Sequence, residues 1–246
     1  ARRHRRPDDA TANSGRTGGG DILIGPNDAR MDKATEQPLR LPAPCGVLEV
    51  RYAAPTAGRP VAVICHPHPL FGGSLDNKVV FTLMRSFQQL GLGTLRFNFR
   101  GVGASSGHYD DGRGELDDLA ALCHWLAQQG NARLWLAGFS FGAYIAARGC
   151  QAAADWGVTV EQLILVAPPV GRFDFSLLQR FDCPVTLLQG EADELVTADG
   201  VAAWAEQLHS PHQLLRFADC SHFFHGQLVE LRSRLVAALA PTLVTA

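Results

Sequence analysis

Residues 133–150 read RLWLAGFSFGAYIAARGC, and this stretch decides the fold. Its first six residues form a short apolar run that is typical of a buried strand, and residues 141–150 favour a helix. Between them the pattern G-x-S-x-G spans Gly138–Gly142 and centres on Ser140. A strand, a sharp turn that carries a serine, and a helix together make a nucleophile elbow, which lifts the serine hydroxyl above the edge of a sheet. Ser140 is therefore the predicted nucleophile.

The same pattern occurs a second time at Gly103–Gly107, where it centres on Ser105. Residues 107–112 read GHYDDG, which is typical of a loop and supplies no helix after the serine. The context therefore favours Ser140 over Ser105. The simpler alternative is that Ser140 only occupies a tight turn and does no chemistry.

Strands alternate with helices on both sides of this stretch, from residue 46 to residue 240. This order predicts an α/β fold in three layers, with a mostly parallel central sheet between helices. We expect one domain over residues 31–246, because no repeat or linker interrupts the pattern. The expected strands are 47–52, 60–65, 94–99, 133–138, 162–166, 185–189 and 213–217, and the expected helices are 77–90, 115–128, 141–150, 198–208 and 222–239.

The connection after the strand at 162–166 is short. Residues 167–183 leave room for one short helix around 175–178 but not for a cap domain. The sequence therefore predicts an open site, which suits small esters better than long lipid chains.

A serine nucleophile needs an acid and a histidine, and in this kind of fold they follow the serine in that order. The strand 185–189 leads into the acidic segment Gly190–Glu194. The carboxyl ends of parallel strands are where open sheets place their sites. Asp193 is the predicted acid, and Glu191 and Glu194 are the alternatives.

The base is expected after the next strand, 213–217. His222 is the predicted base. His225 follows three residues later, on the same face if this segment is helical, and is the alternative.

An oxyanion hole needs two backbone N–H groups. One comes from the residue after the nucleophile, Phe141, and the other from the loop after an inner strand, here CHPHPLFGG at 65–73. Pro67 and Pro69 have no N–H to donate. His68 and Leu70 remain as the two candidates for the second donor.

The pair His66-x-His68 also raises the possibility of a metal site, but zinc would need a further ligand that the neighbouring sequence does not supply. Gly101-x-Gly103 is not followed directly by a helix and so is not a dinucleotide fingerprint. We expect no metal and no cofactor.

Six segments taken together resemble a known family. HPHPLFGG, NKVV, RFNFRGVGASSG, GFSFGAY, GEADELV and SHFFH follow one another within residues 40–240. The set is similar to that of small lidless bacterial α/β-hydrolases, near the dienelactone hydrolase-like and serine esterase branches. The resemblance implies a triad of Ser140, Asp193 and His222 and a metal-free hydrolysis of small esters or thioesters through an acyl-enzyme. Dienelactone hydrolases use a cysteine nucleophile, so Ser140 argues against that particular activity.

Two alternatives to an esterase stay open. One is a serine peptidase or amidase that uses the same triad, and the other is a non-catalytic relative that only binds a ligand. The triad residues count against the second alternative, because a binding protein has no need of all three.

Composition limits the possible partners. The chain has 246 residues, 46% hydrophobic and 19% charged, with a net charge of −2, which is an ordinary globular balance. This charge does not favour nucleic acid or a membrane as a partner, and a small-molecule ester is the expected one.

No uninterrupted apolar run of transmembrane length occurs. The six cysteines are scattered, so we expect reduced thiols and a cytoplasmic protein.

The start of the chain differs from the rest. Residues 1–30 begin with arginines and continue with polar residues, without the apolar segment of a signal peptide. We expect a disordered tail there, with a nucleic-acid-binding arm as the alternative. Among 22 basic residues only Lys33 and Lys78 are lysine, a bias that is typical of a GC-rich genome and favours a bacterial origin.

Overall fold

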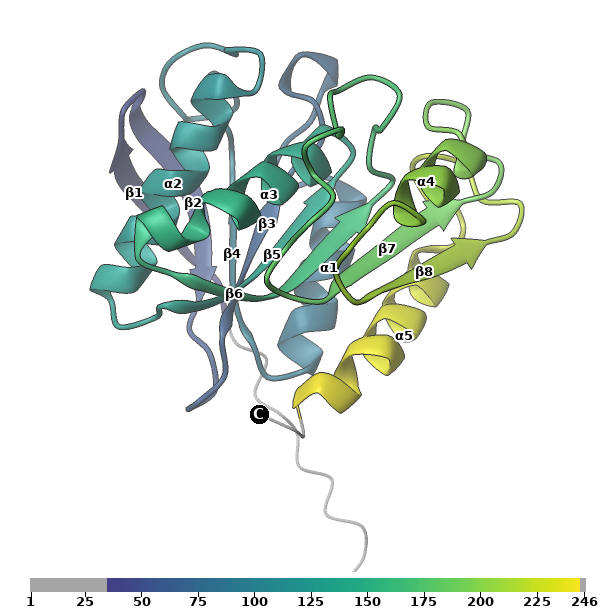
Figure 1. The fold of residues 1–246 in the computed structure, drawn as a ribbon. Helices are drawn as coiled ribbons and strands as arrows, with labels where there is room; N and C mark the ends of the chain where they lie inside the picture. Colours follow the sequence, from purple (N-terminus) through teal and green to yellow (C-terminus); the bar gives the residue numbers. More distant parts are fainter. Residues whose placement is uncertain (1–34, 244–246) are drawn as a thin grey trace, which may run out of the picture. The chain divides into compact units, whose positions relative to one another are not determined.

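Eight strands form one sheet in the order β1-β2-β4-β3-β5-β6-β7-β8 (Figure 1). The structure is a computed structural model that describes residues 35–243, and the tail expected over residues 1–30 lies outside them. β2 pairs antiparallel with β1 and β4, and all other neighbours are parallel, which confirms the predicted mostly parallel sheet. The strands are β1 (Gln37–Ala43), β2 (Gly46–Ala53), β3 (Val61–Cys65), β4 (Gly93–Phe97), β5 (Arg133–Phe139), β6 (Thr159–Val166), β7 (Val185–Gly190) and β8 (His212–Phe217).

Helices cover both faces of this sheet, which confirms the predicted three layers (Figure 1). None of the helices among residues 35–243 has the length and apolar character needed to cross a membrane. One face carries α2 (Arg113–Gln128), α3 (Phe141–Ala152) and α4 (Ala198–Ala205), and the other carries α1 (Lys78–Gln89) and α5 (Leu228–Leu239). Three short 3-10 turns are η1 (Pro69–Phe71), η2 (Ala153–Trp156) and η3 (Ala240–Leu243).

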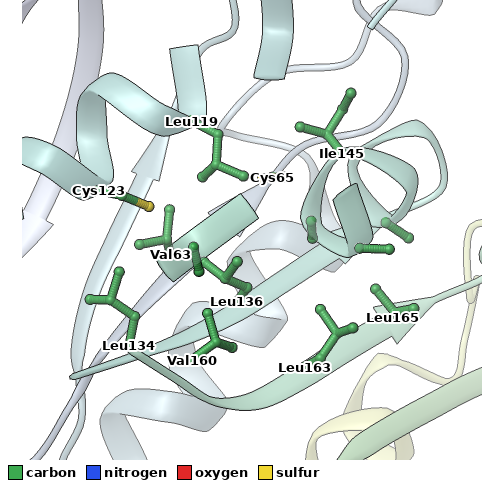
Figure 2. Close-up of a cluster of buried hydrophobic side chains, with 14 of the residues drawn as sticks. Val63, Cys65, Leu119, Cys123, Leu134, Leu136, Ile145, Val160, Leu163 and Leu165 are labelled. Atoms are coloured by element: carbon green, nitrogen blue, oxygen red, sulfur yellow. The ribbon is translucent and has the colours of Figure 1, made fainter. Parts of the chain in front are cut away.

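The central strand β3 shows why its sequence is a continuous apolar run. Val61, Val63 and Cys65 pack into the cluster under α2 and α3, part of which Figure 2 shows. Ala62 and Ile64 point to the opposite face and pack against α1. Because both faces of the strand are covered, an alternating apolar–polar pattern would leave polar groups buried.

The strand β1 was not predicted. It contains Pro38 and Pro42, which have no N–H for a sheet ladder, and its side chains are mostly exposed. The strand lies at the edge of the sheet, where proline is tolerated, so its apolar pattern is weak.

Two predicted helices also differ from the structure. The last helix begins at Leu228 and not at His222, because Phe224 (φ 53°) and Gly226 (φ 77°) have left-handed backbone conformations that a helix does not accommodate. The short helix expected at 175–178 is a turn, in which Ser176 donates from its backbone N–H and its hydroxyl to the Asp174 carboxylate. Asp and Ser at this spacing favour such a turn over a helix.

The connection between β6 and β7 contains neither a helix nor a strand, so the fold has no cap domain, as predicted. Its first part folds back tightly: the backbone N–H groups of Arg172 and Phe173 both donate to the carbonyl of Pro169, at 2.9 and 3.1 Å. Pro169, Arg172 and Phe173 of this turn lie beside Ser140, at the carboxyl end of β5.

His66, directly after β3, joins the ends of two strands. Its Nε2 accepts from the backbone N–H of Phe99 at 3.0 Å, and its Nδ1 lies 2.6 Å from the Pro67 carbonyl, to which it donates. Both ring nitrogens are engaged, so His66 has no lone pair for the metal ion considered above. Burial lowers the pKa of His66 from 6.5 to about 4.

We predict that His66 makes stability depend on pH. Between pH 6.5 and about 4 the unfolded chain binds a proton at His66 that the folded chain does not. The contribution of the neutral His66 to the free energy of unfolding is therefore fully present above pH 6.5 and is lost as the pH falls through this window. The total loss is about 3 kcal/mol once the pH is below the folded-state pKa. Urea denaturation at a series of pH values measures the free energy of unfolding, and NMR of the His66 ring measures its pKa. A folded-state pKa near 6.5 would contradict the prediction.

Candidate functional site

Ser140 lies in a sharp turn between β5 and α3, as the sequence predicted. Its backbone has a left-handed φ of 55°, a strained conformation for a residue other than glycine. Two hydrogen bonds hold this conformation: the Ser140 N–H donates to the Val166 carbonyl at 2.9 Å, and the Ser140 carbonyl accepts from Ala143 at 2.8 Å. The turn presents the hydroxyl at the carboxyl end of the sheet.

The two glycines of the motif allow this turn because the backbone around it is crowded. A Cβ added to Gly138 would lie 2.1 Å from the Gly142 carbonyl oxygen. A Cβ added to Gly142 would lie 2.2 Å from the Cys65 carbonyl oxygen. Only hydrogen fits at either position, and the first turn of α3 therefore packs directly against the backbone after β3.

A chain of two hydrogen bonds links Ser140, His222 and Asp193. His222 Nε2 lies 3.1 Å from Ser140 Oγ, and His222 Nδ1 lies 2.8 Å from Asp193 Oδ2. The side chains of His222 and Asp193 are buried, with 3% and 0% exposed. The structure thus brings together the three residues that the sequence selected from the ends of β5, β7 and β8.

Several donors orient the Asp193 carboxylate. Its Oδ1 accepts from the backbone N–H groups of Leu195 and Val196 at 2.8 and 2.7 Å, and its Oδ2 accepts from Gln189 Nε2 at 3.2 Å. Burial acts to raise the pKa of Asp193, but the hydrogen bonds from His222 and these amides outweigh it and hold the pKa below 3.8. Asp193 is therefore ionised at neutral pH.

Gln189 was not singled out from the sequence. It is fully buried at the end of β7 and also donates to the carbonyls of Gly190 and Val196. Its sequence signal is a polar residue at the carboxyl end of an otherwise apolar strand, three residues after Thr186. It fixes the loop that carries Asp193.

The two alternative acids and the alternative base take no part in this series of hydrogen bonds. Glu191 pairs with Arg216 at 2.9 Å. Glu194 accepts from the backbone N–H of His222 at 3.1 Å and not from its ring. His225 is exposed and lies on a turn, so the helical face that it was expected to share with His222 does not exist.

Ser105, the serine of the second G-x-S-x-G pattern, makes hydrogen bonds of a different kind. Ser105 is buried, donates from its hydroxyl to the Asn98 carbonyl at 2.7 Å, and accepts from the Glu49 N–H at 2.9 Å. It connects β2 to the loop after β4 and has no histidine partner among the described residues. Nearby, Arg100 forms a buried ion pair with Asp118 at 2.8 Å.

The loop after β3 offers backbone donors to the site. The Leu70 N–H is already engaged, because it donates to His68 Nδ1 at 3.2 Å. The His68 N–H has no hydrogen-bond acceptor among the described residues. Phe141 is the first residue of α3, so its N–H has no partner within the helix. The His68 and Phe141 rings lie 5.0 Å apart, which places the two residues side by side.

A cleft of about 380 Å³ opens over Ser140. Its size is in the usual range for a small-molecule site. No cluster of three or more possible metal ligands occurs in residues 35–243. The cleft is lined by Pro67, His68, Phe71, Gly72, Gly73, Asn77, Ser140, Phe141, Pro169, Arg172, Phe173, Leu195, Val196, His222 and Phe223.

Two comparisons of the sequence find similar proteins. Residues 71–174 match a family described as serine aminopeptidase, S33. An uncharacterized protein of Rickettsia prowazekii is 37% identical over 200 residues, which are 76% of this chain and 82% of that protein.

Two solved structures are similar over nearly their whole length. An α/β serine hydrolase homologue from Coxiella burnetii is 45% identical, with a TM-score of 0.77, over 84% of this chain and 98% of that one. An α/β serine hydrolase without lid from Xanthomonas campestris is 41% identical, with a TM-score of 0.75, over 83% of this chain and 94% of that one. With these identities and the fold described above, the chain belongs to the family of α/β serine hydrolases that lack a lid.

Proposed function

We propose that the protein hydrolyses small carboxylic esters or thioesters through an acyl-enzyme on Ser140. The observation that carries this proposal is the hydrogen-bonded series from Ser140 Oγ through His222 to Asp193, with distances of 3.1 and 2.8 Å. Its serine lies on a strained turn at the floor of an open cleft. A protein that only binds a ligand would not need this alignment.

In the proposed reaction the ionised Asp193 accepts from the Nδ1–H of His222. This hydrogen bond leaves the Nε2 lone pair directed at the Ser140 hydroxyl, so His222 takes the proton as Ser140 attacks the ester carbonyl. Asp193 stabilises the imidazolium that forms. His222 then gives the proton to the leaving alcohol or thiol, and a water activated by the same histidine hydrolyses the acyl-enzyme.

We assign the oxyanion hole to the backbone N–H groups of Phe141 and His68. Both lie next to Ser140 in the cleft and have no acceptor within the described chain. Leu70, the other candidate from the sequence, donates instead to His68. Donors that are already in place need no rearrangement when the negative charge develops on the carbonyl oxygen.

The cleft supports small substrates. It has no lid, and the apolar side chains of Phe71, Leu195 and Phe223 around it are themselves partly exposed. An uncovered cleft of about 380 Å³ has no apolar tunnel that would bury a long acyl chain.

The description of the family that matches residues 71–174 favours a second candidate, the hydrolysis of an amide or peptide bond by the same residues. The same serine, histidine and acid serve both reactions, so the leaving group decides between them. A p-nitroanilide and a p-nitrophenyl ester of one acyl group separate the two candidates. Because an ester is intrinsically more reactive than an anilide, turnover of the anilide itself is the deciding result. We expect none, and anilide turnover that Ser140→Ala abolishes would support the peptidase.

We predict opposite outcomes for the two serines of the repeated motif. Ser140→Ala removes the nucleophile and lowers kcat/KM for p-nitrophenyl acetate by about 10⁴-fold or more, with the stability retained. Ser105→Ala keeps the activity per folded molecule but lowers the free energy of unfolding by about 1–3 kcal/mol, because the Glu49 N–H loses its acceptor. Ester assays and urea denaturation measure both. Activity that persists in Ser140→Ala would overturn the proposed nucleophile.

We predict a preference for short acyl chains. In a p-nitrophenyl series from acetate to palmitate, kcat/KM should be highest between acetate and hexanoate and fall for longer chains, because the open cleft does not bury them. Initial rates below the critical micelle concentration measure this, with Ser140→Ala as the background. A maximum at palmitate would be incompatible with the site as described.

A further inference from the structure

Arg172 is a cation at the cleft without a partner in the protein. Its guanidinium forms no hydrogen bond or ion pair among the described residues, and its side chain is exposed. Every other arginine of residues 35–243 except Arg180 donates to a protein oxygen. Arg180 lines a different cleft, with Cys150 and Val160. Arg172 is thus the unpaired arginine beside Ser140 and His222.

The turn that carries Arg172 is held against the helix of the nucleophile. The backbone N–H of Arg172 donates to the Pro169 carbonyl at 2.9 Å, so the residue belongs to a tight turn. The next residue, Phe173, stacks on Tyr144 with ring centroids 4.8 Å apart and packs against Phe141 at 5.5 Å. Both partners belong to α3, the helix that begins directly after Ser140. The turn and the nucleophile therefore share one support.

The charges around the cleft favour an anion. Arg172 is the only lining residue with a permanent charge, and no carboxylate is among the lining residues. Asp193 is buried beneath His222, and Asp174, two residues after Arg172, accepts from Ser176. Asp174 lines the neighbouring cleft together with Arg172, but no ion pair joins the two side chains.

Arg172 also lies where two clefts meet. The neighbouring cleft of about 590 Å³ shares Arg172, Phe173 and Leu195 with the cleft over Ser140. A substrate that extends from the cleft over Ser140 into the neighbouring cleft would therefore pass Arg172. The planar guanidinium fits a carboxylate through two parallel hydrogen bonds.

We propose that Arg172 selects esters that carry a carboxylate away from the scissile bond, such as half-esters of dicarboxylic acids. This inference rests on the ester hydrolysis proposed above and names its substrate class. The chemistry of the reacting carbonyl is unchanged. Arg172 acts on binding, so its effect falls mainly on KM.

The test compares a charged and a neutral form of one substrate, p-nitrophenyl hydrogen adipate and its methyl ester. We expect the native protein to prefer the charged form, and Arg172→Gln to reduce the ratio of the two kcat/KM values by about tenfold or more, mainly through KM. The rate with the neutral ester measures any general effect of the substitution, and the ratio isolates the effect of the charge. Arg172→Lys should retain part of the preference, and added salt should weaken it.

Arg180→Gln is the matched control, because it removes the same charge from the other unpaired arginine and should leave the ratio unchanged. A second pair, 4-acetoxybenzoate and its methyl ester, carries the carboxylate on the alcohol side of the scissile bond. A preference for the charged substrate that depends on Arg172, in either pair, supports the inference. The pair that shows it identifies whether the carboxylate lies on the acyl side or on the alcohol side of the scissile bond. A ratio that Arg172→Gln leaves unchanged in both pairs overturns it.

A binding measurement separates this inference from the proposed function. Calorimetric titration of Ser140→Ala with p-nitrophenyl hydrogen adipate needs no turnover. If the native protein hydrolyses no ester, the proposed function fails, while weaker binding by Ser140→Ala/Arg172→Gln still supports the carboxylate site. If esters are hydrolysed but both variants bind the half-ester equally, the carboxylate site fails and the esterase stands.

Discussion

The close contact between the first turn of α3 and the backbone after β3 is the constraint on which the site depends. Gly142 has space for hydrogen only, because a Cβ there would lie 2.2 Å from the Cys65 carbonyl oxygen. This contact brings the start of a helix, with its free Phe141 N–H, next to the loop that holds His68. Two residues from distant parts of the chain, each with a backbone N–H, thus line the cleft over Ser140 together. A larger residue at position 142 would separate them.

A similar close approach brings the histidine to the acid. Gly190 ends β7, and a Cβ there would lie 2.3 Å from the Cys220 carbonyl oxygen. The segments after β7 and β8 can therefore run side by side, and the Ala192 N–H donates to the Cys220 carbonyl at 3.1 Å. Asp193 and His222 follow directly on these two segments. The parallel sheet supplies neighbouring strand ends, and small residues at those ends let their loops touch.

The sequence predicted seven of the eight strands and the places of Ser140, Asp193 and His222, because these strands are short apolar runs and each of the three residues follows one of them. The sequence did not predict β1, because its prolines are untypical of a strand inside a sheet. It also extended the last helix back to His222, because a left-handed residue such as Phe224 has no reliable sequence signal. The sequence did not distinguish His68 from Leu70 as the second backbone N–H donor of the proposed oxyanion hole. What distinguishes them is the hydrogen bond from the Leu70 N–H to the His68 ring, which depends on the folded loop. Arg172 had no signal at all, because an exposed arginine in a loop is ordinary.

The absence of a cap domain changes what can determine specificity. A lid selects substrates by enclosing them and excluding water, whereas an open cleft must rely on groups that keep their positions without closure. In this chain α3 holds several of those groups, while Asp193 and His222 are held by the segments after β7 and β8. Ser140 and Phe141 begin the helix, His68 packs on the Phe141 ring, and Phe173 holds the turn of Arg172 against the same helix. A helix that holds both the proposed nucleophile and the turn of Arg172 would let a site open to solvent discriminate between substrates without a lid.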